Sequence, residues 1–240
     1  MAERLYTHSK QDAVREGRLD KWERSREANI RCAHDIDSLI DSHTKGGTLV
    51  PGCAKEALER WGFLRVQYVL ANTLIRTGGL GFEPDSLRWA RAVWIAQDRD
   101  NDTFRVQADR PLLAQFVRQT YAEYQALGLF GAEHCVAGSL DYTGKVLILR
   151  PNVLKEEFWS DRNQLWVGET GFGCSPTASG RAVYATCLGD GEKARWERAD
   201  FLGVMDEKYL PDWAQEKLAE LRGPDQEQTD GPARGGMEMG

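Results

Sequence analysis

The chain has 240 residues, of which 41% are hydrophobic and 10% aromatic, enough apolar side chains to bury a sizeable core. Its net charge of −6 is unevenly spread, because residues 1–120 carry 19 Lys and Arg against 17 Asp and Glu, whereas residues 121–240 carry 12 against 20. So modest a charge argues against an extended nucleic-acid surface, although the first half could still bind a polyanion locally.

Two further features bear on where the protein works. No apolar run approaches the roughly 20 residues that cross a bilayer, and the charged start of the chain lacks the apolar core of a signal peptide. Five cysteines at scattered positions fit reduced thiols better than a disulfide framework. We therefore expect a cytoplasmic protein with no membrane partner.

Helical patterning dominates residues 1–128. In chain order we expect a short helix capped by Ser9 and ended by Gly17, a long one with a capping box at Asp20–Glu23 that Gly46 and Gly47 stop, and helices over 51–61, 63–75, 84–89 and 110–128. The segment 63–75 is apolar nearly all round, which favours a helix in the middle of a bundle. β-like runs at 92–97 and 103–107 predict a hairpin near 92–107.

Beyond Gly128 the pattern changes to short β-like runs. They cover residues 145–150, 164–167, 182–188 and 194–198, with a helix expected at 151–158 and a closing helix at 211–221. Residues 223–240 are rich in Gly, Pro, Asp and Gln and are expected to be a disordered tail. The predicted fold class is α+β, with a helical N-terminal domain of residues 1–128 packed against a small antiparallel β-rich domain of residues 129–222.

Four polar residues of the helical part are candidate binding residues. Arg26 and Asn29 fall on or beside the apolar face of the long helix, and Arg65 and Asn72 belong to the apolar segment 63–75. Arg26 and Asn29 either belong to a buried hydrogen-bond network or lined pocket, or sit at the edge of that face and satisfy neighbouring backbone, which is the commoner case. Arg65 and Asn72 need partners wherever they point inward.

The loop from Gly168 to Arg181 supplies two more candidates, Cys174 and Arg181. It joins two β-like runs and is the densest stretch of Gly, Ser and Pro in the chain. We expect hydrogen bonding, or contact with phosphate or carboxylate groups, at these six residues rather than bond-making chemistry.

The sequence contains no complete set of catalytic residues in a recognised pattern. A reactive Cys174 needs a neighbouring base, and His134 would have to be brought close by folding. The zinc-ligand residue types of the second half, His134, Cys135, Cys174 and Cys187, lack the spacing of usual zinc motifs. We therefore assign no catalytic residue, no metal site and no cofactor.

One local spacing leaves an enzyme open as an alternative. Asp206-Glu-Lys208, with Asp190 or Asp200 upstream, has the local order of carboxylates and lysine found in metal-dependent nucleases. The same residues also suit a charged cap before the last helix, and that interpretation is favoured on spacing alone.

Several longer motifs carry a resemblance to a known family. Leu5-Tyr-Thr-His-Ser9, Arg31-Cys-Ala33 and the run from Gly62 to Thr73 resemble a family of uncharacterised proteins carried on integrative and conjugative elements of Gram-positive gut bacteria. The stretches 171–176, 180–183 and 198–204 resemble a module that accompanies it, so the likeness spans roughly residues 5–222.

The resemblance implies a setting rather than a reaction. Genes of this kind travel with inhibitors of host restriction and of RNA-guided nucleases, so we expect a mobile-element accessory that binds a host or mobile-element protein such as a defence nuclease. Two alternatives are a metal-dependent enzyme acting on nucleic acid, with Asp200, Asp206 and Lys208 as its residues, and a nucleic-acid-binding accessory of conjugation.

Overall fold

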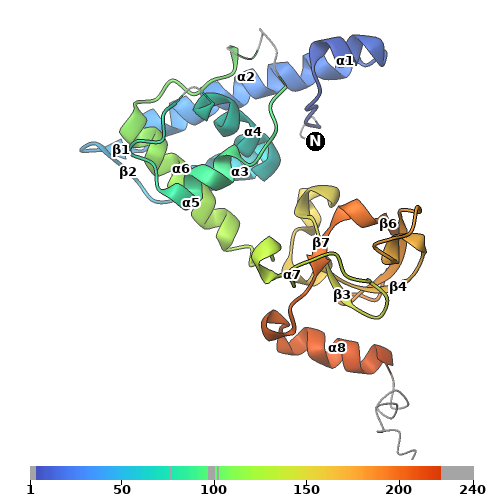
Figure 1. Cartoon of the computed structure of the whole chain (residues 1–240). Coiled ribbons are helices and arrows are strands. Elements are labelled where there is room, and N and C mark those ends of the chain that lie inside the picture. Colours follow the sequence, from blue (N-terminus) through green and yellow to red (C-terminus); the bar gives the residue numbers. More distant parts are fainter. Residues whose placement is uncertain (1–3, 76, 97–100, 102, 223–240) are drawn as a thin grey trace, which may run out of the picture. The chain divides into compact units, whose positions relative to one another are not determined.

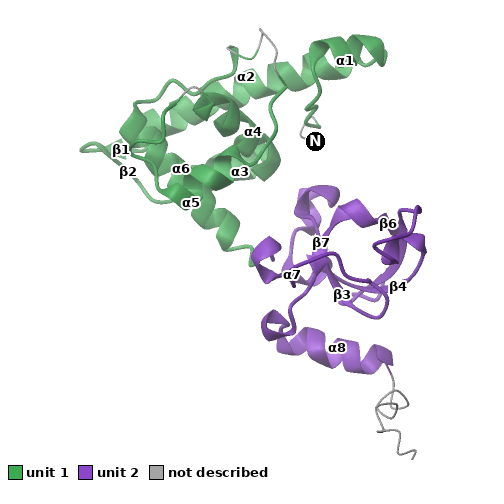
Figure 2. Ribbon diagram, in the orientation of Figure 1, with its two compact units in different colours: residues 1–128 green, residues 129–240 purple. Residues whose placement is uncertain are grey.

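The computed structural model describes residues 4–75, 77–96, 101 and 103–222 (Figure 1). The chain forms two compact units, residues 1–128 and 129–240 (Figure 2). Helices dominate the first unit, and the second contains a five-stranded antiparallel sheet. The α+β fold class expected from the patterning is confirmed. Among the described residues, no helix is both long and apolar enough to cross a membrane.

The first unit is a helical bundle with one small hairpin. Its elements are α1 (Lys10–Arg15), α2 (Leu19–Ser42), β1 (Thr44–Lys45), β2 (Thr48–Leu49), α3 (Cys53–Trp61), α4 (Phe63–Leu74), α5 (Pro84–Arg91) and α6 (Arg110–Gln125). One continuous apolar cluster joins α2, α3, α4 and α6, with Ile36, Val69 and Phe116 fully buried in it. As its composition predicts, α4 is buried along most of its length.

The ends of the long helix differ from the expectation. α2 begins at Leu19, so Asp20 lies inside its first turn and is not its N-cap residue. The expected capping box is absent, since no side chain caps this N-terminus. It ends at Ser42, and Gly46 and Gly47 instead form the turn of the β1–β2 hairpin, where both have positive φ. The helix thus ends before these glycines, with His43 as its C-cap residue.

The expected hairpin near 92–107 is wrong for the described residues, which contain no strand there. The backbone groups of this segment bond to helix side chains instead of to a partner strand. Asn72 Nδ2 donates to the carbonyl of Phe104 at 3.2 Å, Thr73 Oγ1 accepts from Val106 N at 3.1 Å, and Asp37 Oδ1 accepts from Gln107 N at 2.8 Å. Residues 97–100 and 102 of the expected hairpin lie outside the described residues.

The second unit is built on a sheet in the order β6-β5-β4-β3-β7, with every neighbouring pair antiparallel. Its strands are β3 (Val146–Leu149), β4 (Leu165–Thr170), β5 (Ala182–Cys187), β6 (Lys193–Glu197) and β7 (Phe201–Val204). Two short helices complete it, α7 (Asp161–Gln164) and α8 (Asp212–Arg222). The expected helix at 151–158 is two separate 3-10 turns, because Leu154 and Lys155 between them are extended.

Two apolar clusters lie on the two faces of this sheet, since alternate strand residues point to opposite sides. Leu147, Val183 and Ala185 belong to one cluster, whereas Val146 and Ile148 belong to the other, which α8 covers with Ala214 and Leu218. The remaining 3-10 turns are Ala132–His134, Phe172–Cys174, Arg198–Asp200 and Glu207–Tyr209. The expected tail, residues 223–240, lies outside the described residues.

Candidate functional site

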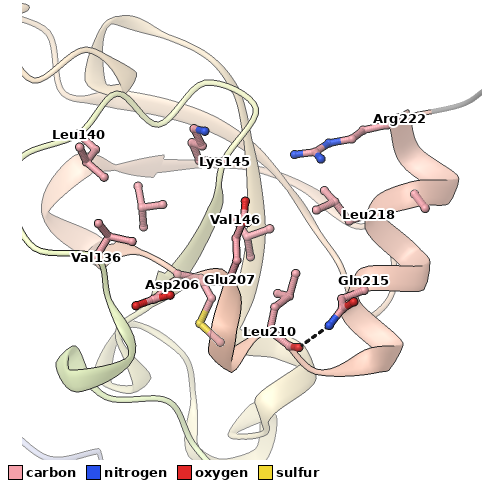
Figure 3. Close-up of a pocket in the computed structure, with 13 residues that line it drawn as sticks. Val136, Leu140, Lys145, Val146, Asp206, Glu207, Leu210, Gln215, Leu218 and Arg222 are labelled. Carbon is pink, nitrogen blue, oxygen red and sulfur yellow. Dashed lines mark hydrogen bonds between the residues drawn. The ribbon is translucent and has the colours of Figure 1, made fainter. Parts of the chain in front are cut away.

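The second unit carries a groove of about 940 Å³ beside its closing helix (Figure 3). Strands β3 and β7 form its floor with Val146, Val204 and Met205, all of them nearly buried. One wall is the face of α8 that presents Gln215, Leu218, Ala219 and Arg222, and the other is the loop that carries Val136 and Leu140. A volume of this size is typical of ligand pockets in proteins.

Backbone pairing holds the loop wall in place. Val136 N donates to the carbonyl of Val204 at 2.9 Å, and Asp206 N donates to the carbonyl of His134 at 2.9 Å, so the loop follows the outer edge of β7. Val136 is 39% exposed although it is apolar, which leaves it available to a bound molecule.

Residues of both charges line the groove. At one end Lys145 is exposed, and Arg222 reaches from the end of α8 toward it, donating from Nη2 to the carbonyl of Gly144 at 3.1 Å (Figure 3). Asp206 and Glu207 line the groove where β7 leads toward α8. Lys208 pairs with Asp206 at 2.8 Å, and hydrogen bonding to Lys208 lowers the pKa of the Asp206 carboxyl.

None of the six residues predicted as binding candidates lines this groove. The structure brings two of them together in the first unit: Arg65 donates to Asn29 Oδ1 and, at 3.1 Å, to the carbonyl of Ser25. Arg65 and Asn29 are each 3% exposed, so they join α4 to α2 and do not face a ligand. These two acceptors are the partners that an inward-pointing Arg65 requires.

Arg26 and Asn72 make contacts in two different parts of the first unit. The Arg26 guanidinium lies 5.7 Å from the centre of the Trp22 ring, a cation–π distance, with Nε buried. Asn72 is 3% exposed and donates to the carbonyls of Asn101 and Phe104, so it anchors the segment after α5. Neither residue lines the groove of the second unit.

The loop candidates Cys174 and Arg181 differ in burial. Cys174 is 2% exposed in the sheet's core cluster, and burial raises the pKa of its thiol, which opposes nucleophilic chemistry. Arg181 is exposed. The loop is braced instead by Arg198, which donates to the carbonyls of Gly173, Cys174 and Leu140 and lies 3.8 Å from the Tyr142 ring centre. Sequence patterning gave no sign of this role.

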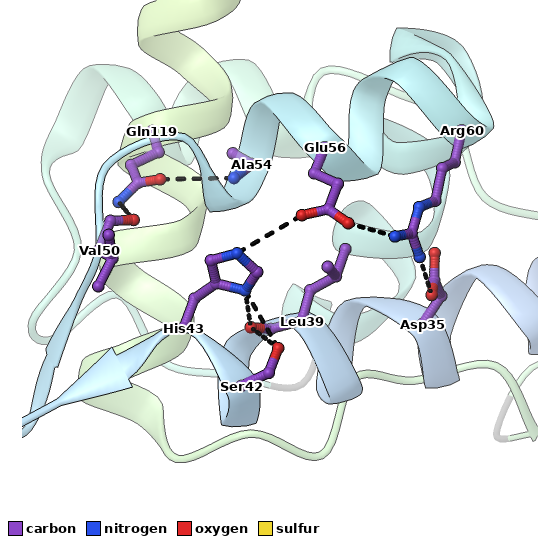
Figure 4. Close-up of polar contacts among 9 residues, drawn as sticks. All are labelled: Asp35, Leu39, Ser42, His43, Val50, Ala54, Glu56, Arg60 and Gln119. Atoms are coloured by element: carbon purple, nitrogen blue, oxygen red, sulfur yellow. Dashed lines mark hydrogen bonds and ion pairs between the residues drawn. The ribbon is translucent and has the colours of Figure 1, made fainter.

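A chain of polar contacts in the first unit includes His43, and both ring nitrogens of this histidine are occupied by protein groups (Figure 4). Arg60 bridges Asp35 on α2 and Glu56 on α3, and Glu56 Oε2 lies 3.5 Å from Nε2 of His43. The other ring nitrogen, Nδ1, lies 2.9 Å from the carbonyl of Leu39. Because both nitrogens face protein groups, the chain joins two helices and leaves no ring nitrogen for a substrate.

The residues of the enzyme alternative are engaged in local caps. Asp200 Oδ2 accepts from Glu197 N at 2.7 Å, and Asp206 accepts from the backbone of Lys208 while it pairs with the Lys208 ammonium. Among the residues that the structure describes, no three His, Cys, Asp or Glu side chains gather as a metal-binding group. The local spacing noted in the sequence thus corresponds to two turn caps in this fold.

The fold and the groove define a two-unit α+β protein with an open groove in its β-rich unit. The chain belongs to the DUF3849 family, described as proteins of unknown function, whose model matches residues 5–125. That match covers α1 to α6 and ends before the unit that carries the groove. The expected membership of an uncharacterised family is confirmed. No curated protein and no solved structure matches the chain.

Proposed function

We propose that this protein is a binding protein that holds a segment of a partner protein in the groove of its second unit. The observation that supports this is the groove itself: an apolar floor bounded by a hydrogen-bonded loop and a helix, with charged residues among those that line it. Grooves of this form bind peptide segments of other proteins by burying their apolar side chains.

The setting that we propose follows the family resemblance noted in the sequence. The protein is an accessory of an integrative or conjugative element of Gram-positive gut bacteria, and its partner is a host nuclease of the restriction or RNA-guided type. The excess of acidic residues in the second half of the chain supports such a partner, since nucleic-acid-targeting enzymes present basic surfaces.

The experiment that tests the proposal is affinity capture from a host that carries restriction and RNA-guided systems, with and without added nuclease. It compares the wild-type chain with Ala219→Trp, which fills the groove from an exposed position of α8, and with Lys217→Trp on the same helix but outside the groove. We expect one protein that survives nuclease treatment, is lost with Ala219→Trp and is retained with Lys217→Trp.

The other outcomes favour the alternatives. Recovery of nucleic acid, or of proteins that vanish when it is digested, would support an accessory of conjugation, whose binding should weaken steeply as salt rises. Divalent-metal-dependent cleavage of DNA or RNA by the wild-type chain, lost on Asp206→Ala, would support the enzyme. Equal capture by the two Trp variants would contradict the groove as the binding surface.

A further inference from the structure

The arrangement of charge along the groove defines the partner segment more closely. Lys145 directly precedes β3 and Arg222 is the last residue of α8, and the two side chains approach each other over the same end of the groove (Figure 3). Arg222 uses one guanidinium N–H on the carbonyl of Gly144, so the others remain for an anionic group. Lys145 has no ion pair among the described residues.

The middle of the groove is apolar. Val146, Met205 and Leu218 present side chains that are 3–9% exposed, and Val136 and Leu140 stand opposite α8. Since α8 rises about 1.5 Å per residue, Gln215 and Arg222 are about 10 Å apart along it, the reach of roughly three extended residues. The apolar floor therefore suits two or three side chains of a bound segment.

Two carboxylates also line the groove, Asp206 on the side of Val136 and Glu207 beside Val146 (Figure 3). Asp206 has Lys208 as a partner at 2.8 Å, but Glu207 is exposed and has no ion pair among the residues that the structure describes. A cation placed beside Glu207 would meet an unpaired carboxylate, whereas Lys208 already balances the charge of Asp206. The groove thus has a basic end at Lys145 and Arg222, an apolar floor, and one carboxylate, Glu207, without an ion pair among the described residues.

We infer that the groove takes a short peptide in one direction, with an acidic group between Lys145 and Arg222, apolar side chains over Val146 and Leu218, and a basic group beside Glu207. This inference rests on the proposed function, because it names the chemistry of the segment that the groove would hold. Exposed charge pairs contribute little to affinity individually, so the apolar side chains supply most of the binding and the charges set its direction.

The test is selection of random twelve-residue peptides displayed on phage against the full chain. We expect wild-type protein to enrich peptides that carry Asp or Glu, two or three large apolar residues and then Lys or Arg. A double variant, Lys145→Glu with Arg222→Glu, should bind these peptides about tenfold more weakly, as measured by fluorescence polarisation of a labelled peptide. Thermal unfolding of the variant confirms that it is folded.

The controls separate this inference from the proposed function. Ala219→Trp should abolish the enrichment, and Lys217→Trp should leave it intact. Peptides that depend on Ala219 but lack an acidic residue, or that bind the charge-reversed variant equally well, would overturn the direction while leaving the groove as a binding site. An absence of any enrichment that depends on Ala219 would overturn the groove itself, and the inference with it.

Discussion

A buried arginine joins two helices of the first unit through oxygen atoms of α2. Arg65 is 3% exposed and donates to Asn29 Oδ1 and to the carbonyl of Ser25. Removing the guanidinium would leave those buried acceptors without a donor in a place that water reaches poorly, and such losses are costly.

We predict that Arg65→Ala lowers the free energy of unfolding by about 3 kcal/mol. Chemical denaturation followed by circular dichroism measures it. The matched control is Arg88→Ala, because Arg88 is 78% exposed and pairs with exposed Asp85 on its own helix, so its loss should cost less than about 0.5 kcal/mol. Equal effects of the two substitutions would show that Arg65 is not a structural link.

The thiols provide a second prediction at the residue scale. Burial raises the pKa of all five, to about 12 at Cys32 and to about 11 at Cys53 and Cys187, with upward shifts also at Cys135 and Cys174. At pH 8.5 a free cysteine is about half thiolate, and these residues should be far less so. We expect native protein to react with a disulfide reagent at least about tenfold more slowly than denatured protein.

The same shifts predict how stability responds to alkaline pH. The thiol pKa values are higher in the folded chain than in the unfolded chain, so the stabilising effect is complete below about pH 8.5 and is lost as pH rises toward the folded values. For the reactivity prediction above, a Cys174 that reacts in native protein as fast as a free thiol would contradict its placement in the core.

At the scale of elements, one glycine sets the turn between α3 and α4. Gly62 ends one helix and begins the next, and its φ of 76° with ψ of 163° lies in a region that is essentially closed to residues with a side chain. We predict that Gly62→Ala destabilises the first unit by about 1–3 kcal/mol, measured by thermal unfolding.

The control for this prediction is Gly17→Asn. Gly17 has a φ of 65° and open space around it, a left-handed position at a helix end that asparagine tolerates. It should lower stability by less than about 1 kcal/mol. A Gly62→Ala variant as stable as Gly17→Asn would mean that the α3–α4 junction can relax to an ordinary helical connection.

At the scale of the whole molecule, the apolar clusters divide in the same way as the compact units. One cluster lies wholly within residues 1–128, and two lie within residues 129–222. We predict that a fragment of residues 129–222 folds alone, with a cooperative thermal transition and a β-type circular dichroism spectrum.

The fragment should also bind the peptides selected on the full chain with the same affinity, because all residues of the groove belong to it. An unfolded fragment would show that the first unit is needed to complete its core. A folded fragment with lost binding would show that residues outside the groove contribute to recognition.

Local patterning was enough to predict much of the secondary structure. The apolar run of α4, the helix end at Gly62 and the strands β3 to β6 follow from periodicity and from Gly and Pro positions, which act within a few residues. The same patterning gave a wrong prediction for the segment after α5. Its alternating residues resemble a strand, but the side chains of Asn72, Thr73 and Asp37 form hydrogen bonds with its backbone groups.

The sequence by itself determined the α+β class and the need of Arg65 and Asn72 for buried partners, since each follows from local periodicity and from the cost of burying polar groups. Tertiary structure alone decided what those partners are, that Cys174 is buried, that Arg198 braces its loop, and that a groove exists. The groove combines residues from 136 to 222 in four separate segments. No local pattern marks such a surface, because the path of the chain in space brings its walls together.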